Sequence, residues 1–495
     1  MKTSIKSYPP HQQSVGPKLE LGLTGILLLG LAGCAVGPTF APPKPPKTGQ
    51  YGANALPAGT VASPAPLGDA QSFLQGAQIP ERWWTSFGSQ ELDERVDQAI
   101  QHSPSVASAQ AALRRAQENL RAANGGRLPS VDFQAGATRE NTGPTGMITS
   151  PYTLYNASVS VSYTLDLFGG VRRGIELQQA LADQQRWFLR GTYLTLAANV
   201  ATASIQEAGL RAQLQAAEAV VDLFKEQEDL THKQVTLGAK SSADLLAATA
   251  NLAGAQAMLP GLRQQLEALR NQLYIYLGRF PSEGGLGSMN LDGLTLPKDL
   301  PVTLPSVLVR QRPDVLAAEA QLKAATAQVG LAAANLLPRL TLGGSYGPST
   351  TQSRNILNSD VMAWNAGLNL LQPIFHGGSL RAQKRAAAAG LDQAEADYRA
   401  TVLNAFGNVA GALDALQFDA ETLRARTEAE RAAASSLDLA RAQYRLGAAS
   451  YLQLLDATRL WQGARTGLIQ AQSARLADTT ALYAALGGGW ASQTN

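Results

Sequence analysis

Apolar and polar residues alternate strictly along the stretch Asn156–Phe168 (NASVSVSYTLDLF) of this chain, up to its last residue. Period-two alternation is typical of a β-strand with one dry face and one wet face. Three further stretches, 130–139, 340–346 and 364–370, alternate in the same way. The sequence therefore predicts four two-faced strands, paired as hairpins over about 130–168 and about 339–375.

The segments between these strands carry helical patterns. We expect helices over 92–124, about 171–237, about 241–278, about 312–335, about 380–446 and about 450–487. In the helix expected over about 171–237, apolar residues recur at alternating steps of four and three, which is the 3.5-residue period of coiled coils. They are Leu210, Leu214, Ala217, Val221 and Phe224. At 1.5 Å per residue, each of the two longest helices spans on the order of 100 Å. Neither is apolar enough to be a membrane span.

The pattern occurs twice in the chain. Pro104 and Pro313, Gly238 and Gly447, and Gly278 and Gly487 are each 209 residues apart. This distance is too long for a solenoid repeat, so two copies of one unit are the better interpretation. We assign the first repeat to 81–290, the second to 291–490, and a short tail to 491–495.

The N-terminal 33 residues resemble a lipoprotein signal peptide. Three lysines precede an apolar core of about a dozen residues, which is shorter than the roughly 20 residues that a spanning helix needs. The core ends in Leu31-Ala32-Gly33-Cys34, which is similar to the bacterial lipobox. The resemblance implies that Cys34 is lipidated and becomes the mature N-terminus. Residues 34–80 are rich in proline at first and are interpreted as an extended, lipid-anchored tether.

Composition narrows the functional classes. The 495 residues carry a net charge of only +3 and no dense basic patch, which argues against nucleic-acid binding as the main role. Cys34 is the one cysteine, so the chain cannot form an internal disulfide or a cysteine metal site.

No catalytic constellation is visible in the sequence. His102, His232 and His376 have no partners at metal-ligand spacing. The stretch Gly238-Ala239-Lys240-Ser241 faintly resembles a phosphate-binding loop, but no glycine precedes it at the required spacing and a helix leads into it. We therefore predict no enzyme activity, no metal and no cofactor apart from the covalent lipid.

Four amphipathic strands cannot close a membrane barrel, because the smallest transmembrane barrels have about eight strands. Open strand edges are not stable in lipid. The chain must therefore oligomerise, and each strand becomes part of a shared pore with lipid outside and water inside.

Several motifs resemble the outer-membrane efflux lipoproteins of the TolC/OprM class. They are Trp83-Trp84, Leu165-Asp-Leu-Phe-Gly-Gly170, Leu304-Pro-Ser-Val-Leu-Val-Arg-Gln-Arg-Pro-Asp314, Leu337-Pro338, and Tyr444-Arg-Leu-Gly447 ahead of Leu454-Leu-Asp-Ala457. The resemblance extends over nearly everything after Cys34. It implies a mainly α protein in which each chain gives four β-strands and long coiled-coil helices to a homotrimer. In that trimer a twelve-stranded outer-membrane β-barrel continues into a twelve-helix α-barrel.

The same resemblance implies the function and the partners. The protein is expected to be the outer-membrane exit duct of a tripartite efflux system for small molecules such as drugs. Its expected partners are a periplasmic adaptor, an inner-membrane transporter of the resistance-nodulation-division class and outer-membrane lipid. Protein export through an ATP-driven transporter, and a lipid-anchored coiled-coil scaffold without a pore, are the alternatives.

The expected site residues gather at the helix turns. Gly238 and Gly447, with Tyr444 beside the second, mark the turns at the end far from the barrel. Leu452, Asp456 and Arg459 follow on one helix face, at steps of four and three. By resemblance to the family, Leu452 and Asp456 form the apolar and acidic constriction of a periplasmic aperture. The same resemblance implies that Asp244 is a partner acid, in the first copy, that ties the helix pairs shut.

Overall fold

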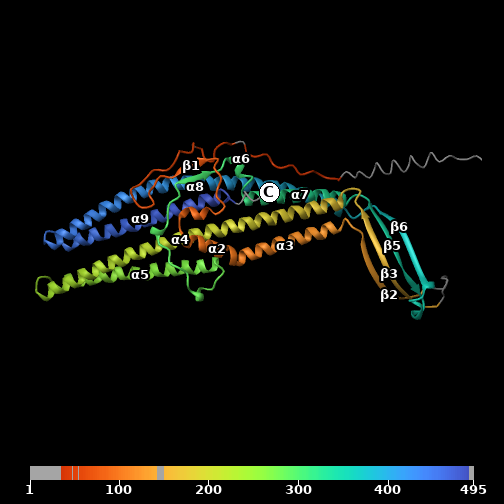
Figure 1. Ribbon diagram of the computed structural model, residues 1–495, viewed down its shortest axis with the longest axis horizontal. Coiled ribbons are helices and arrows are strands. Elements are labelled where there is room, and N and C mark those ends of the chain that lie inside the picture. The colour runs from red at the N-terminus through yellow and green to blue at the C-terminus, as the bar shows by residue number, and fades with distance from the viewer. Residues whose placement is uncertain (1–34, 47, 54, 142–149, 490–495) are drawn as a thin grey trace, which may run out of the picture. The chain divides into compact units, whose positions relative to one another are not determined.

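A computed structural model describes residues 35–46, 48–53, 55–141 and 150–489 (Figure 1). The signal peptide, Cys34 and the tail at 491–495 therefore lie outside the described residues. The elements in chain order are β1 (Ser72–Gln75), η1 (Trp83–Phe87), α2 (Gln90–His102), α3 (Pro104–Gly125), β2 (Ser130–Glu140), β3 (Tyr152–Leu165), α4 (Gly170–Thr236), α5 (Ser242–Tyr276), η2 (Pro281–Glu283), η3 (Leu291–Gly293), β4 (Asp299–Val302), α6 (Pro305–Leu308), α7 (Pro313–Ala334), β5 (Arg339–Thr350), η4 (Ser353–Asn355), η5 (Ser359–Val361), β6 (Met362–Leu371), α8 (Ser379–Arg445) and α9 (Tyr451–Ala485).

The helices of the two halves agree in length. Helices α3 and α7 have 22 residues each, α4 and α8 have 67 each, and α5 and α9 have 35 each. Helix α5 runs through Pro260 without interruption.

The expectation of a single helix over 92–124 is wrong. The structure divides it into α2 and α3 at Ser103, whose backbone is extended with φ −65° and ψ 127°. Pro104 is the cause, because proline has no N–H for a continuing helix and disfavours helical backbone at the residue before it. Proline is well suited to the start of a new helix, and α3 begins at this residue.

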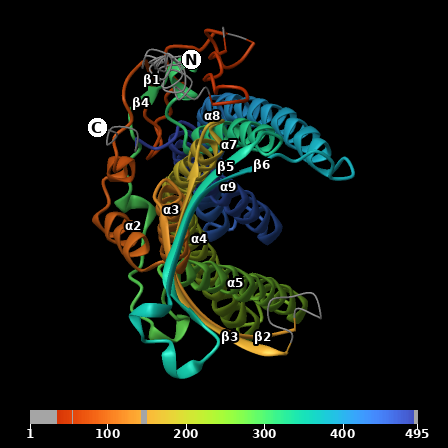
Figure 2. The ribbon, with the colours of Figure 1, turned by 90° about the vertical axis from the view of Figure 1, so that its right-hand side faces the viewer.

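Four strands form one antiparallel sheet in the order β2-β3-β5-β6. Figure 2 shows this sheet curved across its width. The strand expected to reach Phe168 ends at Leu165. The carboxylate of Asp166 instead accepts hydrogen bonds from the N–H groups of Val171 and Arg172, at 3.0 and 2.9 Å. Asp166 thereby satisfies two donors in the first turn of α4 that have no partner within the helix.

The expected count of four strands per chain is too low. Strands β1 and β4 form a second, parallel sheet, in which Ser72 pairs with Asp299. These strands have only four residues each, too few for their alternation to be recognised in the sequence.

Much of the tether expected over 34–80 is packed rather than extended. The guanidinium of Arg475 is fully buried and donates to Thr60 Oγ1 and to the carbonyls of Leu67 and Asp69, at 3.0, 3.1 and 2.7 Å. Ser63 Oγ lies within hydrogen-bond distance, 3.0 Å, of Thr427 Oγ1. These contacts hold the segment against α8 and α9, because each of its buried carbonyls needs a donor.

The chain divides into two compact units. Unit 1 comprises residues 1–40, 119–179 and 323–392, and unit 2 comprises residues 41–118, 180–322 and 393–495. The units do not coincide with the repeats assigned to 81–290 and 291–490, since each unit takes segments from both. Unit 1 contains the four-stranded sheet, whereas unit 2 contains the main apolar core around Trp83, Phe87 and Leu416.

The coiled-coil pattern expected in α4 is buried in part, since Ala217 and Phe224 are buried and Leu210, Leu214 and Val221 are half-buried. Within unit 2 a similar period runs along α8. The residues Val402, Ala405, Val409, Ala412, Leu416, Ala420 and Leu423, which are spaced three or four apart along α8, are all buried. Val220 and Phe224 of α4 pack in one cluster with Ala255 of α5 and Leu455 of α9. Apolar packing therefore joins the helix pair α4–α5 to the pair α8–α9.

The Arg312-Pro313-Asp314 block lies where α7 begins. The guanidinium of Arg312 donates to both carboxylate oxygens of Asp314, at 3.0 and 2.6 Å. Its third nitrogen donates to the carbonyl of Ala485 at 2.5 Å, in the last turn of α9. Arg312 thus caps one helix where another begins, with its orientation held by a bidentate carboxylate.

Candidate functional site at the helix turns and the sheet face

The two long helix pairs turn at equivalent glycines. Gly238 has φ +76° and Gly447 has φ +74°, a left-handed conformation that strains any residue with a Cβ. Beyond them, the N–H groups of Ala239 and Ala448 donate to the carbonyls of Gln234 and Gln443, each at 2.8 Å. This is the Schellman arrangement, which satisfies the last carbonyls of a helix.

The structure places Asp244 in the first turn of α5. Its carboxylate accepts from the N–H and the hydroxyl of Ser241, at 3.0 and 2.7 Å, while Ser241 accepts from the N–H of Asp244. The Ser241 hydroxyl and then its backbone N–H lower the pKa of this carboxyl. Asp244 is therefore part of a capping box, and its expected role as a tie between the helix pairs stays a prediction.

A lysine that the sequence analysis did not select connects the two helix pairs. Lys240 donates from Nζ to Tyr444 Oη, and its ammonium lies 4.9 Å from the ring centre of Tyr444 and 5.8 Å from that of Tyr451. Gln227 also donates to Tyr444 Oη, at 3.1 Å. Lys240 lies in the Gly-Ala-Lys-Ser stretch, and its packing against two tyrosines is a structural role for that stretch.

Leu452, Asp456 and Arg459 all lie on the exposed part of α9, as their spacing predicts. Leu452 is 63% exposed, which is a large value for a leucine, because other apolar residues of α9 are buried. The guanidinium of Arg459 donates to Asn251 Oδ1 of α5 at 3.1 Å. The structure thus brings the three residues to one surface beside α5, and their role as an aperture stays a prediction.

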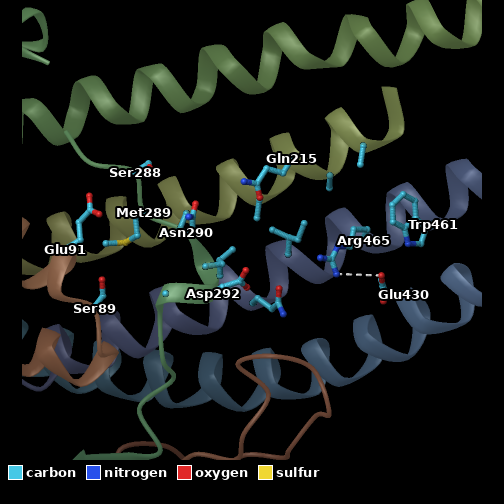
Figure 3. Close-up of a pocket in the computed structure, with 18 residues that line it drawn as sticks. Ser89, Glu91, Gln215, Ser288, Met289, Asn290, Asp292, Glu430, Trp461 and Arg465 are labelled. Carbon is cyan, nitrogen blue, oxygen red and sulfur yellow. Dashed lines mark ion pairs between the residues drawn. The ribbon is translucent and has the colours of Figure 1, made fainter. Parts of the chain in front are cut away.

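A cavity of about 800 Å³ lies in unit 2 between α4, α8, α9 and the loop at 288–293 (Figure 3). Polar groups line much of it, and the guanidinium of Arg465 lies 3.8 Å from the carboxylate of Glu430. No group of three or more His, Cys, Asp or Glu side chains among the described residues could hold a metal ion.

The sheet has one apolar and one polar face. Its pairing aligns Phe133, Val159, Tyr346 and Trp364 in one row across all four strands. The adjacent row consists of Asp132, Ser160, Ser345 and Asn365. The apolar row is exposed, up to 76% at Trp364. The predicted two-faced strands are confirmed, with their apolar faces on the same side.

Comparison with known proteins agrees with this geometry. Residues 96–279 and 304–488 each match the family described as outer membrane efflux protein. The chain is 30% identical to the pyoverdine export outer membrane protein OpmQ of Pseudomonas putida, over 87% of this chain and 93% of that protein. It is also 30% identical to the outer membrane protein OprJ of Pseudomonas aeruginosa, over 96% of this chain and 97% of that protein. The solved structure of the outer-membrane channel OprN is 29% identical, covers 92% of this chain and 100% of its own, and superposes with a TM-score of 0.82.

Proposed function

Because this chain belongs to the outer membrane efflux protein family, we propose that three copies of it assemble into one continuous duct. It is an outer-membrane protein, and its function is that of the exit duct of a tripartite efflux system. Three copies supply twelve strands to a membrane barrel, which exceeds the minimum of about eight. Below the barrel they supply the twelve long helices of an α-barrel.

The open apolar sheet carries this proposal. Its outer strands β2 and β6 each have a neighbour on one side only among the described residues. In lipid each free edge must find a partner, since unpaired backbone groups have no water to bind there. Exposed apolar side chains along α5, such as Leu246 at 70% and Ile275 at 60%, support a further contact between copies.

The two halves of the chain derive, in this proposal, from a duplicated unit. Equal helix lengths and the two separate matches to one family support this origin. Duplication accounts for the number of strands, because one unit supplies one hairpin of the barrel.

We expect small molecules as the exported cargo, passed on by a periplasmic adaptor and an inner-membrane transporter of the resistance-nodulation-division class. Relatives named for export of pyoverdine and for efflux of antibiotics and toluene favour small molecules over the protein-export alternative. A scaffold without a pore would have no use for the exposed apolar sheet face. The duct needs no catalysis and no cofactor beyond a lipid on Cys34.

The assembly test compares unheated and heated membrane extracts on a denaturing gel. We expect an unheated band at three times the chain mass that converts to a monomer band on heating. A monomer band before heating, from protein that is correctly inserted, contradicts the trimer.

The lipid test is mass spectrometry of the mature N-terminus. We expect an acylated Cys34, because the Leu-Ala-Gly-Cys sequence follows a short apolar core. An unmodified N-terminus at another residue refutes the anchor without affecting the trimer result.

A further inference from the structure

The three residues that follow Cys34 are held against the strand–helix junction of unit 1. The N–H of Val36 donates to the carbonyl of Phe168 at 3.1 Å. Arg173, in the first turn of α4, donates from Nε to the carbonyl of Val36 at 3.1 Å and from Nη2 to that of Gly37 at 3.4 Å. Arg173 is only 5% exposed, and Glu176 fixes its remaining nitrogen at 2.7 Å. The segment is bound by its backbone, through a buried and oriented cation.

Glycines make the room for this segment. A Cβ at Gly169, where φ is +79°, would lie 2.7 Å from the Cα of Ala35. A Cβ at Gly37, where φ is +94°, would overlap the Cα of Gly330 on α7. A Cβ at Gly330 itself would lie 2.8 Å from Nε of Arg173. The backbones approach so closely that none of the three positions accepts a side chain without a shift.

The second copy of the repeat lacks this arrangement. At the offset of 209 residues, Gly169 corresponds to Gly378, Arg173 to Ala382 and Gly330 to Arg121. A Cβ at Gly378 would meet nothing within 4 Å. Ile374 and Phe375, shortly before Gly378, are exposed, whereas Leu167 and Phe168, directly before Gly169, are half-buried. Of the two repeats, as far as the structure describes them, only the first therefore offers such a slot, and the N-terminal segment occupies it.

We propose that Gly169, Arg173 and Gly330 form a docking slot for the first residues of the mature chain, which fixes the place where a lipid on Cys34 enters the membrane. This rests on the proposed lipidation of Cys34. Cys34 is bonded directly to Ala35, and adjacent Cα atoms are about 3.8 Å apart. The slot therefore holds the acylated residue beside the end of β3, where a free tether would let the lipid insert anywhere within its reach.

Amide hydrogen exchange on the full-length trimer in lipid nanodiscs tests occupation of the slot. We expect the peptide covering residues 35–40 to be protected, and its exchange to accelerate about tenfold or more in Gly330→Leu and in Arg173→Ala. Gly390→Leu, at a helical glycine with open space around it, is the matched control and should leave protection unchanged. Unprotected wild-type residues, or protection that survives both slot variants, overturns the slot.

A double-mutant cycle tests the link to the lipid. Trimer yield is measured for Gly330→Leu, for Cys34→Ser expressed behind a cleavable leader, and for the combination. If the slot acts by positioning the lipid, the double variant should lose no more trimer yield than Cys34→Ser loses alone. Additive losses overturn the positioning role even where the slot is occupied. The same N-terminal peptide reports acylation by its mass, so a slot that is protected around an unmodified Cys34 refutes the anchor and not the docking.

Discussion

Asp419 of α8 and Asp478 of α9 place two carboxyl groups against each other in unit 2. Burial, followed by the hydrogen bond to Asp478 and its charge, raises the pKa of Asp419 to about 7 from 3.8. Arg475 opposes this shift only in part, because the same guanidinium serves Thr60, Leu67 and Asp69. At the equivalent positions of the first repeat the chain has Leu210 and Leu269. The carboxyl pair is thus a feature of the second repeat alone.

This pair should make the stability of the protein depend on pH. Because the folded-state pKa of Asp419 lies above its unfolded value, the folded protein binds more protons between about pH 4 and about pH 7, and stability falls as pH rises through that window. Asp419→Asn removes the ionisation, so its thermal midpoint should decline less between pH 5 and pH 8 than that of the wild type. Asp414→Asn, at an exposed carboxylate on the same helix, is the control. Equal slopes in wild type and Asp419→Asn would exclude the pair as the source.

The aperture residues allow a second test at this scale. On the proposed trimer, three copies of Leu452 and Asp456 meet around one axis and narrow the duct. Replacing both with alanine should raise single-channel conductance in planar bilayers and admit large antibiotics such as vancomycin in cells. Leu439→Ala, at a leucine on α8 of similar exposure (59% against 63% for Leu452), should change neither. An unchanged conductance in a correctly assembled double variant would place the constriction elsewhere.

Among the elements, the four-stranded sheet places adjacent residues of a strand in the most different surroundings, on its apolar and its polar face. Val161 and Ser160 are adjacent in β3 but belong to opposite faces, since Val161 pairs with Val131 and Ser160 with Asp132. If the apolar face meets lipid, arginine at Val161 should cost about 2–4 kcal/mol and lower trimer yield, whereas arginine at Ser160 should mainly alter conductance. Gel assays of assembly and bilayer recordings measure the two effects. Similar trimer yields for both variants would show that the assigned lipid face is wrong.

The elements also show how far the sequence was informative. The expected ends of the long helices differ from the observed ends by one or two residues, because glycine turns and apolar periods are local signals. The pairing of Ser72 with Asp299 has no local signal in the sequence. The same is true of the contact between Arg475 and the segment at Asp69. Their partners lie hundreds of residues away, and only the folded chain brings them together.

The residues of the candidate site also differ in how far the sequence predicts them. The spacing of Leu452, Asp456 and Arg459 was sufficient to place them on one exposed surface. Asp244 lies in the Ser-x-x-Asp capping box of α5, a local motif that the sequence itself carries, and its expected link between the helix pairs stays a prediction. The contact between Lys240 and Tyr444 could not be predicted, since it joins residues 204 positions apart.

For the whole molecule, the edges of β2 and β6 that lack a neighbouring strand in the described part of the chain have a genetic consequence. The proposed barrel closes only when both edge strands of every copy pair with a neighbouring copy. One copy with a defective edge strand therefore inactivates the whole trimer, including the two wild-type copies in it. A variant with proline in the middle of β6, which removes a ladder hydrogen bond, should therefore be dominant. Expressed in equal amounts with the wild type, and with random mixing of three copies, it leaves about one eighth of the trimers intact. Drug sensitivity of the mixed strain, compared with a strain carrying a deletion in place of the variant, measures this. If the mixed strain were as resistant as the deletion control, the copies would not share a barrel.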